Sequence, residues 1–183
     1  MKCLVTGGAG FIGSNLVDRL ISEGHEVVVI DNLSTGKKEN LNPEADFWNV
    51  DITRMRRDID FTMFKNVDVV FHMACLARVQ PSIEEPLEYH NHNVNGTINI
   101  LEGCRKHNVK RLVFSSSSSV YGDVEEKDLP TSENNKLNPM SPYALHKLVG
   151  EQYCKLYSEL YNIETVCLRY FNVYGERQNT EGA

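Results

Sequence analysis

A glycine-rich segment near the amino terminus constrains the fold of this chain more than any other feature of its sequence. The segment TGGAGFIG (6–13) follows KCLVTG (2–7), a short apolar run that is typical of a buried strand. It leads into FIGSNLVDRLISEG (11–24), where apolar residues recur at helical spacing and Gly24 suits the end of the helix. Because a Cβ atom at these glycines would block a tight turn and the approach of a pyrophosphate to backbone N–H groups, this order predicts a dinucleotide-binding fold.

The rest of the chain alternates between strand-like and helix-like segments. Further apolar strands are predicted at 26–31, 45–51, 67–73, 109–115 and 163–171, and helices near 54–65, 87–107 and 143–161. The last helix begins with Ser141 as N-cap and Pro142 as first helical residue, after a polar, proline-containing loop at 122–142. Strands joined by helices predict a doubly wound parallel sheet of the Rossmann type, an α/β fold with three α/β/α layers, in one domain over 1–183.

Composition and charge argue against several classes of function. The formal net charge is −6, so no basic field attracts nucleic acid, and no apolar run approaches the roughly 20 residues that span a bilayer. The first residues lead directly into a strand and do not form a signal peptide. Neither the five scattered cysteines nor the six histidines have the spacing of metal ligands. We therefore expect reduced thiols, no metal, no nucleic-acid or membrane partner, and a cytoplasmic location.

Asp31 ends the second predicted strand, EVVVID, at the distance from the glycines where dinucleotide-binding folds carry an acidic residue. A carboxylate at this place accepts hydrogen bonds from ribose hydroxyls and repels a 2′-phosphate. The sequence therefore favours NAD over NADP as the cofactor. The alternative is that Asp31 is an ordinary aspartate at the start of a loop.

Five consecutive serines, Ser115–Ser119, leave open whether FSSSSSVYG (114–122) is a flexible linker or part of a site. Serine tracts usually mark solvated chain. Here the run follows the predicted strand 109–115, and parallel sheets bind their ligands at the carboxyl ends of strands. Downstream, SPYALHK (141–147) places Tyr143 and Lys147 four residues apart, hence on one face of a helix.

The spacing of Tyr143 and Lys147 suggests an activated base. A tyrosine phenol has an unperturbed pKa of about 10 and is a poor base at neutral pH. A cation about 4 Å away contributes on the order of 4 kcal/mol at an effective dielectric near 20, which lowers that pKa by about three units. We predict that Lys147, helped by a positively charged nicotinamide, activates Tyr143, and that a serine hydroxyl holds the substrate oxygen. The alternative is a solvated Tyr–Lys pair.

Together these stretches resemble the extended short-chain dehydrogenase/reductase family, in its NAD-dependent nucleotide-sugar epimerase/dehydratase branch, and most of all its UDP-glucose or UDP-N-acetylhexosamine 4-epimerases. The matching stretches cover the whole chain in the family's order: TGGAGFIGS, IDNLSTG, VDI, HMAC, PLEY, NVNGT, FSSSSSVYG, SPYALHK and LRYFNVYG. The resemblance implies an epimerase that oxidises C4 of a UDP-sugar with NAD and returns the hydride to the other face of the 4-keto sugar. It also implies a homodimer formed through the helices near 87–107 and 143–161.

The resemblance assigns roles to individual residues. Ser117, Tyr143 and Lys147 are implied to be catalytic, with Tyr143 as the base, and Ser117, Tyr143 and Asn172 to contact the substrate. The residues implied to bind NAD are Gly7, Gly10, Phe11 and Ile12 at the phosphates, Asp31 and Asn32 at the adenosine ribose, Asp51 and Ile52 at the adenine, and Met73, Ala74, Tyr143, Lys147 and Tyr170 near the nicotinamide.

The sequence also departs from the family's pattern. Ser118 and Ser119 stand where dehydratases and decarboxylases of this branch carry acidic residues, which argues against those two reactions. Cys75 and His92 also differ from the residues usual in epimerases. Family members continue well past Ala183 into a smaller domain that closes over the substrate, so we expect a truncated or cut chain that lacks most of it. The alternatives are then an NAD-binding module without turnover, or another extended short-chain reductase or dehydratase acting on a nucleotide sugar.

Overall fold

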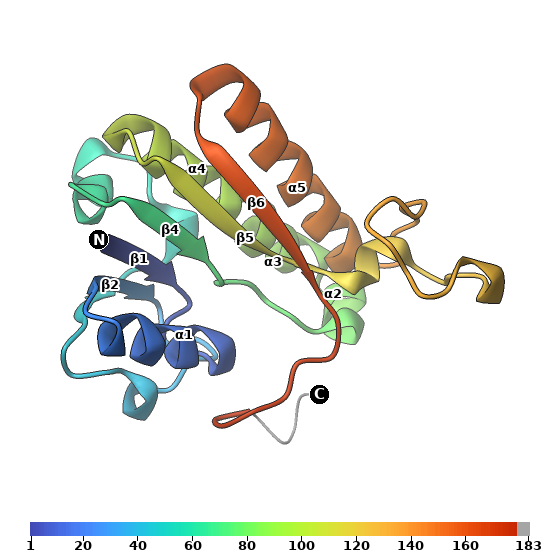
Figure 1. Ribbon diagram of the computed structural model, residues 1–183, viewed down its shortest axis with the longest axis horizontal. Coiled ribbons are helices and arrows are strands. Elements are labelled where there is room, and N and C mark those ends of the chain that lie inside the picture. Colours follow the sequence, from blue (N-terminus) through green and yellow to red (C-terminus); the bar gives the residue numbers. More distant parts are fainter. Residues whose placement is uncertain (179–183) are drawn as a thin grey trace.

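The computed structural model describes residues 1–178, and its centre is a parallel sheet of six strands (Figure 1). The strands are β1 Lys2–Thr6, β2 Glu26–Asp31, β3 Asp46–Asn49, β4 Val69–His72, β5 Arg111–Ser117 and β6 Glu164–Tyr170. The α-helices are α1 Phe11–Ser22, α2 Val79–Glu84, α3 Pro86–His90, α4 Gly96–His107 and α5 Pro142–Tyr161. The strand order β3-β2-β1-β4-β5-β6 is that of a doubly wound dinucleotide-binding sheet, so the predicted fold class is confirmed.

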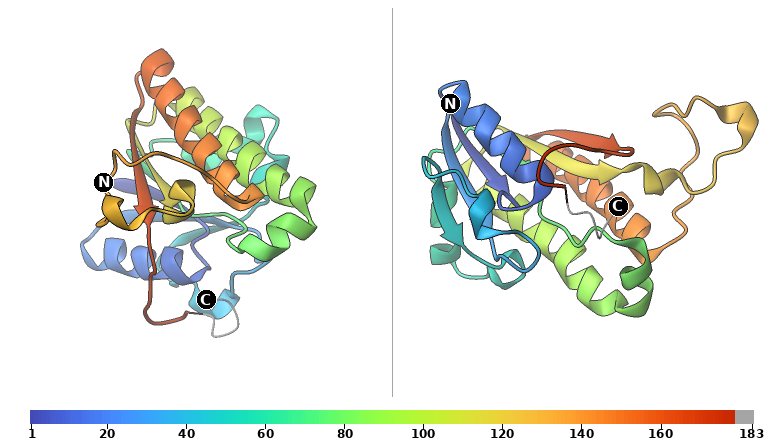
Figure 2. Two further views of the ribbon diagram at one scale, coloured as in Figure 1. Left: turned by 90° about the vertical axis from the view of Figure 1, so that its right-hand side faces the viewer. Right: turned by 90° about the horizontal axis from the view of Figure 1, so that it is seen from below.

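Side chains of the central strands alternate between two hydrophobic clusters, one on each face of the sheet. Cys3, Val5, Val27 and Val29 pack with Val17 and Leu20 of α1, whereas Leu4, Val28 and Ile30 belong to the cluster that includes residues of α4 and α5. Figure 2 shows α1 on one side of the sheet and α4 and α5 on the other. Both faces are therefore covered, which explains why the strands read as continuous apolar runs.

The ends of the two best-defined helices follow the predicted signals. After α1, Gly24 has a φ of +80° and its N–H donates to the Ile21 carbonyl at 2.8 Å. At the start of α5, the Ser141 hydroxyl accepts from the Ala144 N–H at 3.1 Å, and Pro142 is the first helical residue. The loop 122–142 between β5 and α5 extends away from the sheet (Figure 1).

The prediction of a helix near 54–65 was wrong. The structure has short 3-10 turns instead, at Ile52–Arg54 and Asp58–Phe64. The Asp60 carboxylate accepts from the N–H groups of Arg56 and Arg57, which favours a tight turn over an α-helix. Phe61, Met63 and Phe64 of this turn are buried against the core.

The predicted helix near 87–107 exists, but it is irregular in its middle. A π-helical turn at Asn91–Asn95 joins α3 to α4. Asn93, within this turn, is buried at 3% exposure. Such turns often occur beside functional sites.

Helix α5 approaches the sheet closely at Gly150. A Cβ atom at this position would lie 2.4 Å from the Phe114 ring of β5, closer than packed atoms come. The glycine therefore allows the middle of α5 to lie directly on Phe114.

At the outer edge of the sheet, β6 leaves the side chains of Val166 and Leu168 about two-fifths exposed. Among the helices of residues 1–178, none combines the length and apolar character that crossing a bilayer requires.

Candidate active site

The glycine turn after β1 is shaped by contacts that exclude larger side chains. Gly7 has a φ of +70°, its N–H donates to the Ile30 carbonyl at 2.8 Å, and a Cβ atom on it would lie 2.8 Å from the Ala74 nitrogen. A Cβ atom on Gly13 would lie 2.1 Å from the Gly7 carbonyl oxygen. The turn therefore brings α1, β1 and the chain after β4 together, and Phe11 and Ile12 open α1 with first-turn N–H groups that have no partner within the helix. This cradle fits a dinucleotide phosphate.

Asp31 lies against the same turn. It is 8% exposed, one carboxylate oxygen accepts from the Ala9 N–H at 3.0 Å, and the other accepts from the Leu33 N–H at 2.8 Å. The next residue, Asn32, accepts from the Ser34 N–H at 3.0 Å. The structure thus places Asp31 and Asn32 at the carboxyl end of β2 beside the glycine turn, where a ribose would meet them.

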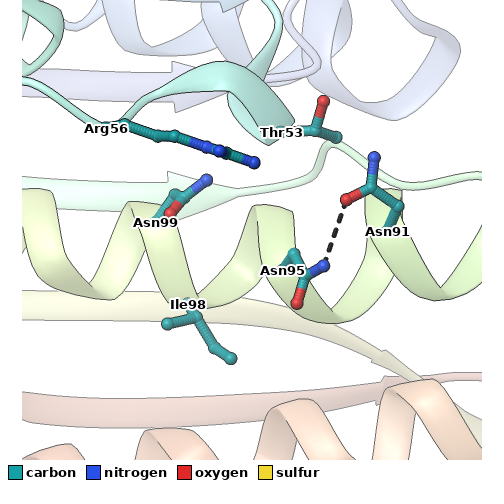
Figure 3. A pocket seen from close by; sticks show the side chains of 6 residues that line it. All are labelled: Thr53, Arg56, Asn91, Asn95, Ile98 and Asn99. Atoms are coloured by element: carbon teal, nitrogen blue, oxygen red, sulfur yellow. Dashed lines mark hydrogen bonds between the residues drawn. The ribbon is translucent and has the colours of Figure 1, made fainter.

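The residues expected at the adenine lie further along the same edge. Asp51 caps a 3-10 turn, and its carboxylate accepts from the Thr53 N–H and hydroxyl at 2.9 and 2.7 Å. Ile52 is buried, and its carbonyl accepts from the Asn99 amide at 2.7 Å. Beyond Thr53 lies a hollow of about 160 Å³, whose lining residues are shown in Figure 3. It is smaller than the 300–1,000 Å³ typical of ligand pockets, and no predicted site residue lines it.

Ser117, Tyr143 and Lys147 come together at the carboxyl end of β5. All are at most 9% exposed. The Lys147 ammonium donates to the Ser115 carbonyl at 2.6 Å and lies 5.8 Å from the centre of the Tyr143 ring. The Ser117 hydroxyl donates to the Ser119 hydroxyl at 3.1 Å, and it lies close enough to the Tyr143 phenol to lower the pKa of that group. Tyr143 and Lys147 are therefore not a solvated pair, and the serine run is not a linker: its first three residues belong to β5, which begins and ends two residues later than the expected strand 109–115.

Burial changes the acid–base balance that the sequence suggests. Burial raises the pKa of Tyr143, and the charge of Lys147 and the nearby Ser117 hydroxyl lower it by less, so the pKa of the phenol is above its ordinary value. The lowering of the Tyr143 pKa that we predicted from the sequence considered the charge of Lys147 and left this desolvation out. Burial also lowers the pKa of Lys147, but the neighbouring Cys75 and Tyr143 groups raise it more, so its net pKa is raised and the amine stays charged.

The residues expected near the nicotinamide lie next to this group. Met73 and Ala74 follow β4, and the Tyr170 hydroxyl lies 3.9 Å from the Met73 sulfur. Tyr170 pairs in register with Ser117, one strand away. The Cys75 thiol lies close enough to the Lys147 ammonium to raise the pKa of the amine. The chain after β4 therefore connects the glycine turn, through Ala74, with the Tyr143–Lys147 pair.

Asn172 lies on the segment that follows β6. This segment returns along the carboxyl edge of the sheet to α1, where Arg177 pairs with Asp18 at 2.5 Å and the Glu176 carbonyl accepts from Asn15 at 3.0 Å (Figure 1). Asn172 itself is exposed. The structure brings it to the same edge as the other predicted residues, but not into the buried cluster around Tyr143.

The sequence analysis missed a buried polar cluster below Ser117. Glu151 lies one helical turn beyond Lys147, and its carboxylate accepts from the Ser116 hydroxyl at 2.5 Å and from both ends of the Arg169 guanidinium at 2.9 and 2.7 Å. Arg169 also donates to the Tyr121 hydroxyl at 2.9 Å. The spacing of Tyr143, Lys147 and Glu151 at i, i+4 and i+8 was the signal that could have indicated it.

Comparisons with known proteins agree with one another. A sequence model of the NAD dependent epimerase/dehydratase family matches residues 3–183. A protein of Methanocaldococcus jannaschii, provisionally named a UDP-glucose 4-epimerase, is 52% identical over 98% of this chain. Two solved structures align with the whole chain: a Thermotoga maritima UDP-glucose 4-epimerase with UDP-glucose (TM-score 0.94, 41% identity) and a Thermus thermophilus UDP-glucose 4-epimerase in complex with NAD (TM-score 0.92, 40% identity). The chain spans 58%, 59% and 58% of the lengths of these three relatives.

Proposed function

The chain belongs to the NAD-dependent epimerase/dehydratase family, and from this premise we propose that it carries the NAD site and the catalytic residues of a UDP-hexose 4-epimerase. The observation that carries the proposal is the convergence of Ser117, Tyr143 and Lys147 beside the cradle formed by Gly7 and Ala74. The relatives named above include one described with NAD and one with UDP-glucose, which supports the cofactor and the substrate class.

In the proposed mechanism, bound NAD would supply the hydride-transfer chemistry at C4 of the sugar. The protein's part is to hold and move a proton. The Tyr143 phenolate accepts the proton of the sugar 4-hydroxyl and returns it at the end, and the Ser117 hydroxyl holds the substrate oxygen. Lys147 stabilises the phenolate by its charge. Because burial raises the pKa of the phenol, Lys147 alone does not ionise it at neutral pH, and the charge of oxidised nicotinamide is needed as well.

The phosphate and ribose contacts are proposed for the residues that surround the glycine turn. Gly7, Gly10, Phe11 and Ile12 would hold the pyrophosphate through the backbone and the start of α1. The Asp31 carboxylate, fixed by two backbone N–H groups, would accept from the adenosine ribose, which favours NAD over NADP. Further along the same edge of the sheet, the ribose would also contact Asn32, and the adenine would contact Asp51 and Ile52.

The substitution Tyr143→Phe tests the assignment. The variant should bind NAD as the wild type does, because the aromatic ring is retained, and should form no UDP-galactose from UDP-glucose, because the phenolic hydroxyl is lost. NAD binding is measured by calorimetry and product by chromatography. Turnover in the Phe variant at the wild-type rate would contradict the role of Tyr143.

A second candidate is an NAD-binding module that does not turn over. The exposure of Asn172, outside the buried cluster, favours it, because a substrate pyrophosphate bound there would have few buried partners. A calorimetric titration with UDP-glucose in the presence of NAD separates the two candidates. The epimerase predicts saturable binding and turnover, and the module predicts NAD binding alone.

We also propose a homodimer through the helices near 87–107 and 143–161. Helix α5 exposes Leu145, Leu156 and Leu160 by 49%, 43% and 61%, and a second copy would remove these side chains from water. Light scattering at micromolar concentration should give twice the mass of the chain. A monomer mass would contradict this proposal.

A further inference from the structure

His72 is a buried titratable residue that the proposed mechanism does not use. It ends β4, is 1% exposed, and both ring nitrogens have partners. Nδ1 lies 2.7 Å from the Thr6 hydroxyl oxygen, and Nε2 lies 3.0 Å from the Thr97 hydroxyl oxygen. The imidazole therefore connects β1 with α4 through the interior of the protein.

The directions of these hydrogen bonds follow from counting protons. The Thr97 hydroxyl donates its one proton to the Asn93 carbonyl at 2.7 Å, so it accepts from His72, and Nε2 carries a proton. A neutral ring then has an unprotonated Nδ1, which accepts from the Thr6 hydroxyl. The Thr6 oxygen is in turn free to accept from the Ala74 N–H, which lies 3.1 Å away. The hydrogen bonds therefore all run in one direction, from the Ala74 N–H through Thr6, His72 and Thr97 to the Asn93 carbonyl, and every donor has an acceptor.

Both ends of this chain of hydrogen bonds bind backbone groups of the segment that follows β4. At one end Thr6 holds the Ala74 N–H. At the other end the buried Asn93 side chain accepts from the Leu76 N–H at 2.8 Å and donates to the Leu76 carbonyl at 2.9 Å. A side-chain amide that pairs with both backbone groups of one residue fixes its position much as a neighbouring strand would.

The segment held in this way, residues 73–76, contacts three parts of the candidate site. Met73 touches Tyr170, Ala74 lies against Gly7, and Cys75 lies close enough to Lys147 to raise the pKa of the amine. A shift of this segment would therefore change the width of the glycine cradle and the surroundings of the lysine together.

We propose that Thr6, His72, Thr97 and Asn93, here called the His72 chain, are positioning residues that hold residues 73–76 as one wall of the dinucleotide site. The identity of the dinucleotide as NAD rests on the proposed function. The order of the hydrogen bonds requires the neutral Nε2–H form of the ring, because a second ring proton on Nδ1 would take away the acceptor of the Thr6 hydroxyl proton.

Neutrality of the ring agrees with its surroundings. Burial and, to a smaller extent, the nearby charge of Lys147 together lower the pKa of His72 to about 3. The ring packs against Phe114, with 5.7 Å between ring centres. A neutral imidazole has one donor and one acceptor on a rigid ring. It can therefore accept from Thr6 on one side and donate to Thr97 on the other.

Nitrogen NMR of the wild-type chain tests the order without any substitution. The ring nitrogens of His72, assigned through the backbone, should show the Nε2–H neutral form without change from pH 8 to pH 5. A ring that carries its proton on Nδ1, or that titrates near the ordinary value of about 6.5, would overturn the His72 chain. Addition of NAD should shift the amide signals of Ala74 and Leu76, and unshifted signals on saturation with NAD would overturn the placement of the wall.

Substitutions then test the positioning role. Thr97→Val keeps the shape of the side chain but removes the hydroxyl, and should raise the NAD dissociation constant about three- to tenfold, whereas Thr97→Ser should restore binding. Thr165→Val, which removes the hydrogen bond from a threonine hydroxyl to the Cys154 carbonyl far from the site, is the matched control and should bind as the wild type does. Wild-type affinity in folded Thr97→Val would overturn the proposal. If the wild type binds no NAD, the proposed function fails, and the ring signals alone decide on the hydrogen-bond order.

Discussion

Replacing Glu151 by Gln should destabilise the chain far more than replacing a surface glutamate that bridges the same strands. The Glu151 and Arg169 side chains are 9% and 19% exposed, and they form two close contacts at 2.9 and 2.7 Å. Removing one charge of such a buried pair typically costs about 3–5 kcal/mol, because the partner is left buried without compensation. We therefore expect Glu151→Gln to lower the free energy of unfolding by about 3 kcal/mol, the low end of that range, since Gln retains a hydrogen-bond acceptor.

The structure supplies a matched control for this substitution. Glu164 of β6 pairs with Arg111 of β5 at the other end of the same two strands, and these side chains are 65% and 53% exposed. A solvent-exposed pair contributes at most about 1 kcal/mol, so Glu164→Gln should have a small effect. Comparing the two variants separates the loss of stability caused by burial of the charges from the loss caused by removing any ion pair.

Urea unfolding followed by circular dichroism measures both variants. With an m-value of about 2 kcal/mol/M, the loss in Glu151→Gln lowers the midpoint by about 1.5 M, and the midpoint of Glu164→Gln moves by at most about 0.5 M. The double variant Glu151→Leu, Arg169→Met should recover most of the stability, because it leaves no unpaired charge. Equal midpoints for the two Gln variants would refute the reasoning from burial.

Further substitutions and a titration test the candidate site itself. Gly13→Ala should weaken NAD binding at least about tenfold in calorimetry, since its Cβ atom would lie 2.1 Å from the Gly7 oxygen. Gly24→Ala, with a φ of +80° but open space around the added carbon, should cost about 1 kcal/mol of stability in urea and leave NAD affinity unchanged. Asp31→Ala should narrow the ratio of NADP to NAD dissociation constants, because it removes the acceptor and the negative charge at the ribose. Since the pKa of Tyr143 is raised, its phenol should remain protonated below pH 10 without NAD. The absorbance difference between wild type and Tyr143→Phe should therefore show ionisation only above that pH, and a step near pH 8 would contradict the expected direction.

The parts of the fold that could be predicted were those that depend on neighbouring residues. The apolar runs, the glycine turn, Gly24 and Ser141 each carry a local signal, and the structure confirmed the elements that they indicate. The turn at 58–64 was misjudged because Asp60 competes for backbone N–H groups, an effect that periodicity does not register.

The features of the site that were missed depend on contacts between distant parts of the chain. The Glu151–Arg169 pair requires α5 to lie against β6, and the desolvation of Tyr143 requires α5 to be packed on the rest of the chain. Neither follows from spacing within one segment. The catalytic and NAD-binding roles of individual residues, the homodimer and the cytoplasmic location stay predictions.

The close approach at Gly150 has a consequence for how this kind of site can be altered. Glycine in the middle of a helix costs about 1 kcal/mol relative to alanine, yet here it sets the distance between α5 and the sheet. Tyr143 and Lys147 stand on that helix, so a single added methyl group, which meets no ligand, would move both away from the serines together. The distance between α5 and the sheet thus depends on the volume of the side chains between them. A small change in that volume can alter the reactivity of Tyr143 and Lys147 without replacing either residue.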